Sequence, residues 1–283
     1  MSYLKSFFTG IIIFLGIQQI TAQQITCSPL DKQAVEQKIE DIATLLQPDF
    51  GNSIVAVGKT FLKTPYVAKT LEVGDTETLV INVQGLDCTT FIENVLAFSM
   101  LLKGDKSDFE TFTKNLERVR YKDGALEGYA SRLHYFTEWI ANNEQKGLLM
   151  DMTSAIGGSP VTKDINFMST HRDLYPFLSD ATNYEKIQAS ERYLNDQVFC
   201  VLAQDKIAEN EHLIQSGDII ALATSIRGLD VTHTGIATRE KDGRIHLLHA
   251  STGSMEVEVS KLPLEDYVKG IKNTIGIMVA RPL

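Results

Sequence analysis

The sequence predicts an α+β protein in which a helical half comes first and an antiparallel sheet follows. In the first half, apolar residues recur at helical spacing, for example Val35, Ile39 and Ile42. After residue 217, short runs rich in β-branched residues are separated by turn residues such as Asp242-Gly243, a pattern typical of antiparallel strands. In this class of fold we expect the active site where the two halves meet.

Residues 1–22 have the pattern of a secretory signal peptide. Lys5 provides the positive charge, Phe7–Ile17 form the apolar core, and Thr21-Ala22 offer a small-residue cleavage point. The apolar core is too short to span a bilayer comfortably. We therefore expect an exported, periplasmic protein whose mature chain, residues 23–283, folds as a single catalytic domain with elaborated loops.

The composition argues against two kinds of partner. No other apolar run is long enough to cross a membrane, so stable membrane insertion after cleavage is not expected. Gln24-Ile25-Thr26 is a poor lipobox, so a lipid anchor on Cys27 is not expected either. The chain has 27 basic and 36 acidic residues and a formal net charge of −9, whereas nucleic-acid binders usually show a basic face. A soluble or neutral substrate suits such a protein better.

Each segment of the helical half has local features that support it. Ser28 and Pro29 provide an N-cap and a first-turn residue for a helix over residues 28–46. Pro65 follows a second helix, which is expected over residues 52–63. A strand is expected over residues 73–83 and a helix beginning at Cys88. Further helices are expected over 109–119, 131–144 and 184–194, with a mixed loop between the helices over 109–119 and 131–144. Residues 152–179 are expected to form a loop with a short helix near 167–174.

The second half contains five segments with the composition of strands. Turns separate them, and Gly235 within one of them would let another backbone or a ligand approach closely. No repeat, low-complexity tract or clear linker follows residue 30, which favours one domain. The strands are expected over residues 217–224, 233–239, 244–249, 254–259 and 274–281.

The three cysteines, Cys27, Cys88 and Cys200, are an odd number. In an exported chain, one cysteine left over after pairing is a candidate reactive thiol. Cys27 and Cys200 could form a disulfide, but all three cysteines could equally be buried as small apolar residues.

Cys88 is placed at the start of an apolar helix pattern. At that position unpaired backbone N–H groups and the helix dipole favour the thiolate, which is the nucleophilic form. The amide of Cys88 could also donate to an oxyanion. Asp87 opposes this activation because its carboxylate raises the thiol pKa, so a histidine has to supply the rest. The alternative is a buried core cysteine, and the histidines decide between the two interpretations.

His233 begins one strand-like segment and His249 ends the next. If five residues connect the strands, the two histidines lie directly opposite each other. If three connect them, they are diagonal on one face, and an even number places them on different faces. His246 is out of phase with His249 and should face the other way. A functional pair thus predicts an odd connection, with His233 as the base for Cys88 and His249 fixing its tautomer.

LDCTTF, HTGIA and HLLHAS resemble the Cys, first-His and second-His motifs of the NlpC-type cell-wall cysteine peptidases. TPYVAKTLE, and the long interval between Cys88 and His233, resemble a Bacteroidetes-type subfamily of N-acetylmuramoyl-L-alanine amidases. The resemblance covers most of the mature chain and implies a papain-like fold, with the helix of the nucleophile packed on the sheet that carries the histidines. It implies no cofactor. The departure is Thr90, where many members have glycine.

The resemblance also implies roles and a substrate. Cys88 is the nucleophile, His233 the base and His249 the orienting residue, and a tyrosine near the oxyanion site corresponds to Tyr66. The expected reaction is hydrolysis of the bond between muramic acid and L-alanine in peptidoglycan fragments (muropeptides), through an acyl-enzyme. The alternatives are a γ-D-glutamyl-diamino acid endopeptidase acting on the same stem peptides and a non-catalytic muropeptide-binding protein.

Other polar residues are weaker candidates for the site. Tyr129, Arg132 and His134, together with Asp87, could line a glycan or peptide groove, although the first three could equally be ordinary surface and core positions of a helix. A metal site made by Cys88 and the two histidines would lack a fourth ligand and the usual local spacings, so no metal is expected.

Overall fold

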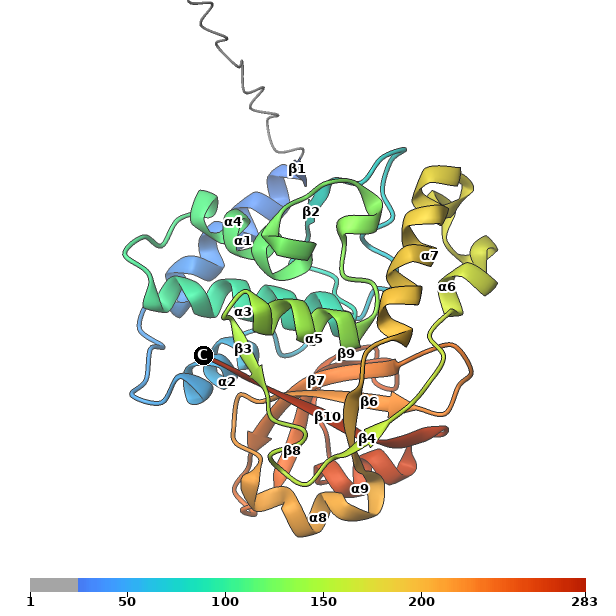
Figure 1. Ribbon diagram of the computed structural model, residues 1–283. Coiled ribbons are helices and arrows are strands. Elements are labelled where there is room, and N and C mark those ends of the chain that lie inside the picture. Colours follow the sequence, from blue (N-terminus) through green and yellow to red (C-terminus); the bar gives the residue numbers. More distant parts are fainter. Residues whose placement is uncertain (1–24) are drawn as a thin grey trace, which may run out of the picture.

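The computed structural model describes residues 25–283, so the predicted signal peptide lies outside the described residues. A group of helices from the first half of the chain covers one sheet, and two short helices lie beyond the sheet (Figure 1). The helices are α1 (Pro29–Ile42), α2 (Phe50–Lys59), α3 (Cys88–Lys103), α4 (Phe109–Arg120), α5 (Phe136–Gln145), α6 (Phe167–Thr170), α7 (Ala181–Asn195), α8 (Ile207–Asn210) and α9 (Leu264–Gly270).

The strands form one small and one large sheet. In the large sheet the order is β4-β5-β10-β6-β7-β8-β9, with β3 also paired to β10, and all of its pairings are antiparallel. The α+β class and the antiparallel sheet are therefore confirmed. The strands are β1 (Ile25–Cys27), β2 (Leu79–Ile81), β3 (Leu149–Asp151), β4 (Ser159–Val161), β5 (Phe199–Ala203), β6 (Ile219–Thr224), β7 (Val231–Arg239), β8 (Ile245–Ser251), β9 (Glu256–Val259) and β10 (Thr274–Pro282).

Several boundaries differ from the sequence prediction. The strand expected over residues 73–83 is reduced to β2, because its pairing with β1 covers only Leu79–Ile81. The helix expected over residues 131–144 begins only at Phe136, because Arg132 is in a β-bridge with Tyr121. Strand β5 and helices α8 and α9 were not expected. Their short segments carry too few residues to establish a period.

The large sheet has an apolar layer on each face. One face contributes Ile236 and Leu248 to the core shared with α2 and α3. The other contributes Ala237 and Leu247 to a second core, which includes Leu264 of α9. Consecutive residues of one strand, such as Ile236 and Ala237, therefore belong to different apolar layers.

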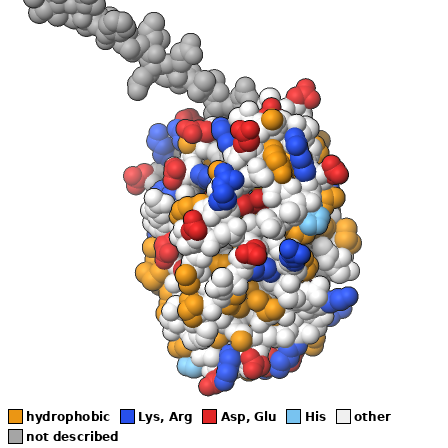
Figure 2. Space-filling model, turned by 45° about the vertical axis from the view of Figure 1, so that its right-hand side comes forward, with side chains coloured by type: hydrophobic (Ala, Val, Ile, Leu, Met, Phe, Trp, Pro, Cys, Tyr) orange, Lys and Arg blue, Asp and Glu red, His pale blue; other side chains and the backbone are white. Residues whose placement is uncertain are grey.

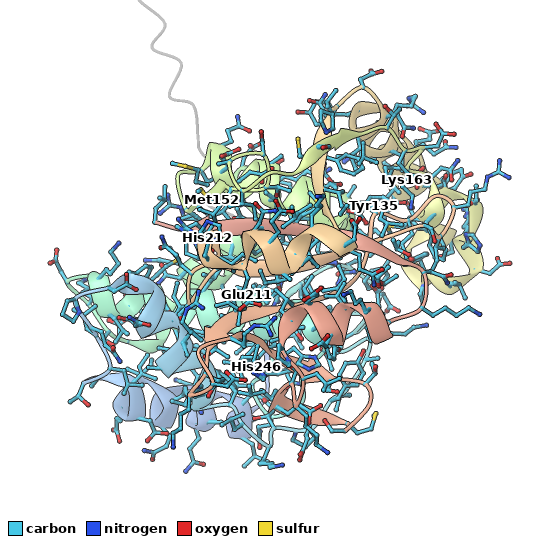
Figure 3. The ribbon with its side chains drawn as sticks, turned by 90° about the horizontal axis from the view of Figure 1, so that it is seen from below. Tyr135, Met152, Lys163, Glu211, His212 and His246 are labelled. Carbon is cyan, nitrogen blue, oxygen red and sulfur yellow. The ribbon has the colours of Figure 1, made fainter. Side chains whose placement is uncertain are left out.

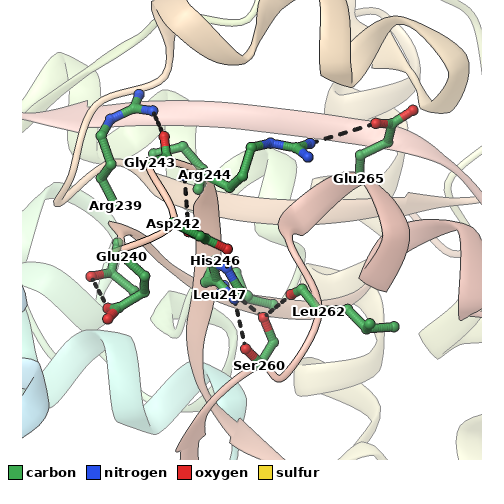
Figure 4. Close-up of polar contacts among 12 residues, drawn as sticks. Arg239, Glu240, Asp242, Gly243, Arg244, His246, Leu247, Ser260, Leu262 and Glu265 are labelled. Carbon is green, nitrogen blue, oxygen red and sulfur yellow. Dashed lines mark hydrogen bonds and ion pairs between the residues drawn. The ribbon is translucent and has the colours of Figure 1, made fainter.

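The connection between β7 and β8 has an odd number of residues. The Glu240 amide donates to the Arg244 carbonyl at 3.0 Å, which leaves three residues in the turn, and Arg239 Nη1 donates to the Gly243 carbonyl (Figure 4). In this register Thr238 lies opposite His246 rather than Arg244. The odd connection is confirmed, and of the two odd connections considered it is the three-residue one that the structure adopts. The histidines take the diagonal arrangement.

Polar contacts anchor this hairpin from outside the sheet. His246 binds the Ser260 carbonyl through Nδ1 and Asp242 through Nε2. The Glu211 carboxylate accepts hydrogen bonds from the Arg244 guanidinium, and Glu211 lies near the hairpin in the view from below (Figure 3). His246 is therefore occupied in a structural role, away from His249.

The described part of the chain has three free cysteines and no disulfide between Cys27 and Cys200. Within residues 25–283, no helix is both long and apolar enough to pass through a bilayer. Acidic and basic side chains are interspersed over the face shown in Figure 2.

Candidate active site

Cys88 is the first residue of α3, as the sequence predicted. Asp87 is the N-cap, and its carboxylate accepts from the Thr90 amide at 2.8 Å while the Thr90 hydroxyl accepts from the Asp87 amide at 2.9 Å. This reciprocal capping box fixes the start of the helix. The capping box thus explains why threonine suits position 90, the one position noted above as departing from the family pattern. The Cys88 amide is among the first N–H groups of the helix, which have no partner within it.

The surroundings of Cys88 favour the neutral thiol. Burial and, to a smaller extent, the Asp87 carboxylate together raise the pKa of Cys88 to about 11, although the amide and hydroxyl of Thr234 and the hydroxyl of Thr89 act in the opposite direction. The Thr234 hydroxyl has no regular hydrogen-bond partner among the described residues and lies near the sulfur. The helix N-terminus alone therefore does not favour the thiolate here, and a reaction at this thiol would need a general base.

His233 and His249 are in direct contact. His233 Nε2 lies 2.7 Å from His249 Nδ1, and the rings are edge to face with centroids 4.8 Å apart. Burial lowers the pKa of His233 to about 4, and burial together with the charge of His233 lowers the pKa of His249 to about 3. Both rings are therefore neutral at pH 7. With Nε2 engaged, Nδ1 of His233 is the nitrogen left to act as a base.

The two histidines lie on one face of the sheet, on the side of α9. His233 lies opposite Leu222 of the second core, and His249 is adjacent to Gly235. The body of α3 packs against the other face. Cys88, at the first residue of α3, is beside Thr234, the residue after His233. The site therefore forms where the start of α3 meets the beginning of β7.

Tyr66 lies beside Cys88. The segment containing Tyr66 runs parallel to Leu86, and the Val67 amide donates to the Leu86 carbonyl at 3.0 Å. Burial raises the pKa of Tyr66 to about 12, and the charges of Cys88 and Asp87 act in the same direction. The Tyr66 hydroxyl thus stays protonated and can donate a hydrogen bond next to the thiol.

A cavity of about 210 Å³ lies at the start of α3, where it is lined by Asp87 and Thr89, the two residues that flank Cys88. Among the candidate substrate residues, Asp87, Arg132 and His134 line this cavity. Tyr129 is buried and does not line it, but its ring contacts the His134 ring in a tilted arrangement with centroids 4.4 Å apart. Tyr129 therefore supports the wall rather than forming it. The remaining lining residues are Lys69, Leu71, Glu72, Thr89, Glu93, Leu133, Leu174 and Tyr175.

The wall of this cavity is held by buried ion pairs. Arg132 contacts Glu72 at 2.5 Å and Glu77 at 3.5 Å, and Arg120 contacts Glu93 at 2.6 Å. Arg132 Nε, Glu72 Oε2 and Glu77 Oε2 nevertheless lack hydrogen-bond partners among the described residues. Positive and negative groups largely balance, and the wall offers both donors and acceptors.

Some site residues could not be found from sequence. Tyr267 of α9 contacts the rings of both histidines, with centroids 5.1 Å from His249 and 6.5 Å from His233. Glu72, Glu77 and Thr234 likewise carry no motif. Only the position of Thr234 directly after His233 could have suggested it. Within residues 25–283, no three His, Cys, Asp or Glu side chains are grouped as a metal site requires.

A family model described as AmiA-like, N-acetylmuramoyl-L-alanine amidase-like, matches residues 56–277. The chain belongs to this family. The match spans the Cys88 helix, both histidines and every residue that lines the cavity. The family is one of amidase-like hydrolases and implies a peptidoglycan-related substrate.

Solved structures agree with the family. An N-acetylmuramoyl-L-alanine amidase from Bacteroides uniformis shares 37% sequence identity, covers 87% of this chain and 99% of its own, and has a TM-score of 0.76. A proposed xylanase from Bacteroides fragilis shares 42% identity, with coverage of 79% and 98% and a TM-score of 0.75. A Legionella pneumophila protein, at 19% identity and a TM-score of 0.67, shares the fold. A search of curated proteins found no match.

Proposed function

We propose that the protein is an exported, periplasmic cysteine amidase that hydrolyses the N-acetylmuramoyl-L-alanine bond of muropeptides on a papain-like scaffold. The observation that carries the proposal is the 2.7 Å contact between His233 and His249 beside a thiol at the start of a helix. That arrangement supplies a nucleophile, a base and an orienting group. The amidase-like family supports the choice of bond.

The reaction follows from these roles. Nδ1 of His233 takes the proton of the Cys88 thiol, and the sulfur attacks the lactyl carbonyl carbon. The Cys88 amide and the Tyr66 hydroxyl donate to the developing oxyanion. The imidazolium then returns its proton to the nitrogen of L-alanine, the C–N bond breaks, and a thioester remains. Water, deprotonated by His233, attacks the thioester and frees the sugar acid and the thiol.

The cavity lined by Arg132 and His134 receives one arm of the muropeptide in this proposal. Its mixture of guanidinium, imidazole, hydroxyl and carboxylate groups suits a ligand rich in amides and hydroxyls. An anion gains less, because both arginines near the wall are already paired with carboxylates.

Glycoside hydrolysis, which the description of the Bacteroides fragilis protein suggests, is not supported by the cavity. A glycosidase usually needs two carboxyl groups that are free to act on the two sides of the sugar bond. Here Glu72 is paired with Arg132, Glu93 is paired with Arg120, and Asp87 caps α3. The carboxylates of the cavity are therefore engaged in holding the structure.

The test is digestion of defined muropeptides by the wild-type chain and by Cys88→Ala, with the products identified by mass. Release of the intact stem peptide from muramic acid, lost in Cys88→Ala, is the expected result. The matched control is Cys200→Ala, which removes another partly exposed free thiol and should retain activity. Sugar that still carries L-Ala-D-Glu would indicate the endopeptidase instead. Binding without turnover would indicate a binding protein, and equal turnover by Cys88→Ala would exclude the cysteine mechanism.

A further inference from the structure

The histidine pair has a proton whose position decides whether His233 can act as a base. His233 Nε2 and His249 Nδ1, 2.7 Å apart, share one hydrogen. His249 Nε2 is buried and has no hydrogen-bond partner among the described residues. Two neutral arrangements of the pair are therefore possible, and they differ in which ring donates.

In the first arrangement His233 donates through Nε2. Its Nδ1 then carries a lone pair and can accept the thiol proton of Cys88, while His249 carries its own hydrogen on Nε2. In the second, His249 donates through Nδ1. His233 then carries its hydrogen on Nδ1 and cannot accept another there, while His249 Nε2 presents a bare lone pair in a buried place. Only the first arrangement is reactive.

Tyr267 is the group that distinguishes the two arrangements. Its ring is 5.1 Å from the His249 ring and inclined by 65°, an edge-to-face contact. The face of an aromatic ring is negative, so it attracts an N–H group and repels a lone pair. We propose that Tyr267 is a positioning residue: its ring receives the Nε2–H group of His249 and thereby holds His233 in the form that can deprotonate Cys88.

Nothing else around His249 supplies this function. His249 is itself the group that orients His233, and no carboxylate of the described residues bonds to either ring, so no acidic group fixes the tautomer of the pair. Tyr267 comes from α9, which packs on the second core through Leu264 and Val268. Its position is therefore set by the sheet layer rather than by the loops around the cavity.

The expected effect separates the ring from the hydroxyl of Tyr267. Tyr267→Phe keeps the aromatic face and should retain kcat within about twofold, whereas Tyr267→Leu should lower kcat about tenfold with KM within about twofold. Tyr193→Leu, on the exposed side of α7, is the matched control. An unchanged kcat in Tyr267→Leu would overturn the proposal, and so would an equal loss in Tyr267→Phe, which would assign the effect to the hydroxyl.

A second measurement needs no substrate. Two-bond ¹⁵N–¹H spectra of the chain with ¹⁵N-labelled histidine report the tautomer of His249, assigned by the signals lost in His249→Asn. We expect hydrogen on Nε2 in the wild type and in Tyr267→Phe, and a mixture in Tyr267→Leu. Hydrogen on Nδ1 in the wild type would overturn the proposal. The kinetic part rests on the proposed function, so a wild type that leaves muropeptides intact refutes that function, while the spectra still test the tautomer.

Discussion

Acid should destabilise the protein through His249, and the size of the effect follows from its burial. His249 has no exposed surface, and its pKa is about 3 in the folded state against 6.5 for an ordinary histidine. Because the folded state binds the proton less well than the unfolded state, this contribution to stability is complete above pH 6.5 and is lost progressively as the pH falls toward 3. Between pH 7.5 and 4.5 the loss amounts to about 3 kcal/mol.

The assay is urea unfolding followed by the fluorescence of Trp139, the single tryptophan of the sequence, which is buried. From pH 7.5 to 4.5, His249→Asn should lose about 3 kcal/mol less stability than the wild type, because the titrating groups that do not contact His249 cancel in the comparison. His212→Asn alters an exposed histidine and should behave like the wild type. Equal losses in the wild type and His249→Asn would refute the argument that His249 is buried and neutral.

Three further outcomes are expected. Arg120→Met leaves Glu93 buried without its partner and should lower the free energy of unfolding by about 3–5 kcal/mol. The double variant Arg120→Met with Glu93→Leu should recover most of that loss. A double variant no more stable than Arg120→Met would contradict the argument that the unpaired Glu93 causes the loss. Gly235→Ala places a Cβ 2.6 Å from Leu247 Cδ1 and 3.0 Å from the Cβ of His249, and the resulting shift should lower kcat at least about tenfold. Gly253→Ala, which meets only the Ser251 hydroxyl at 3.5 Å, is the control that should be unaffected. The rate at which iodoacetamide alkylates Cys88, measured by peptide mass, should rise about tenfold per pH unit between pH 7 and 10, because the raised pKa keeps the thiol protonated in this range. A rate that no longer rises above pH 7 would show that Cys88 is already a thiolate at pH 7.

Local patterns determined the elements that carry the chemistry. Ser28 caps α1, Asp87 caps α3, and Cys88 is its first residue, because capping depends on residues three positions apart. The alternation along β7 and β8 placed His233 and His249 on one face for any odd connection. These features depend only on residues that are close together in the chain, so they can be predicted from the sequence alone.

Only the tertiary structure decided how those elements meet. The hydrogen bond from Glu240 to Arg244 selected the diagonal register over direct opposition, and long-range packing left Cys27 and Cys200 unpaired. The contact of Tyr267 with His249 joins α9 to β8, and the cavity wall joins residues from four separate segments between 69 and 175. Such contacts depend on the relative positions of elements that are distant in the sequence. Those positions result from hydrophobic burial across the whole chain, so they cannot be read from any local sequence pattern.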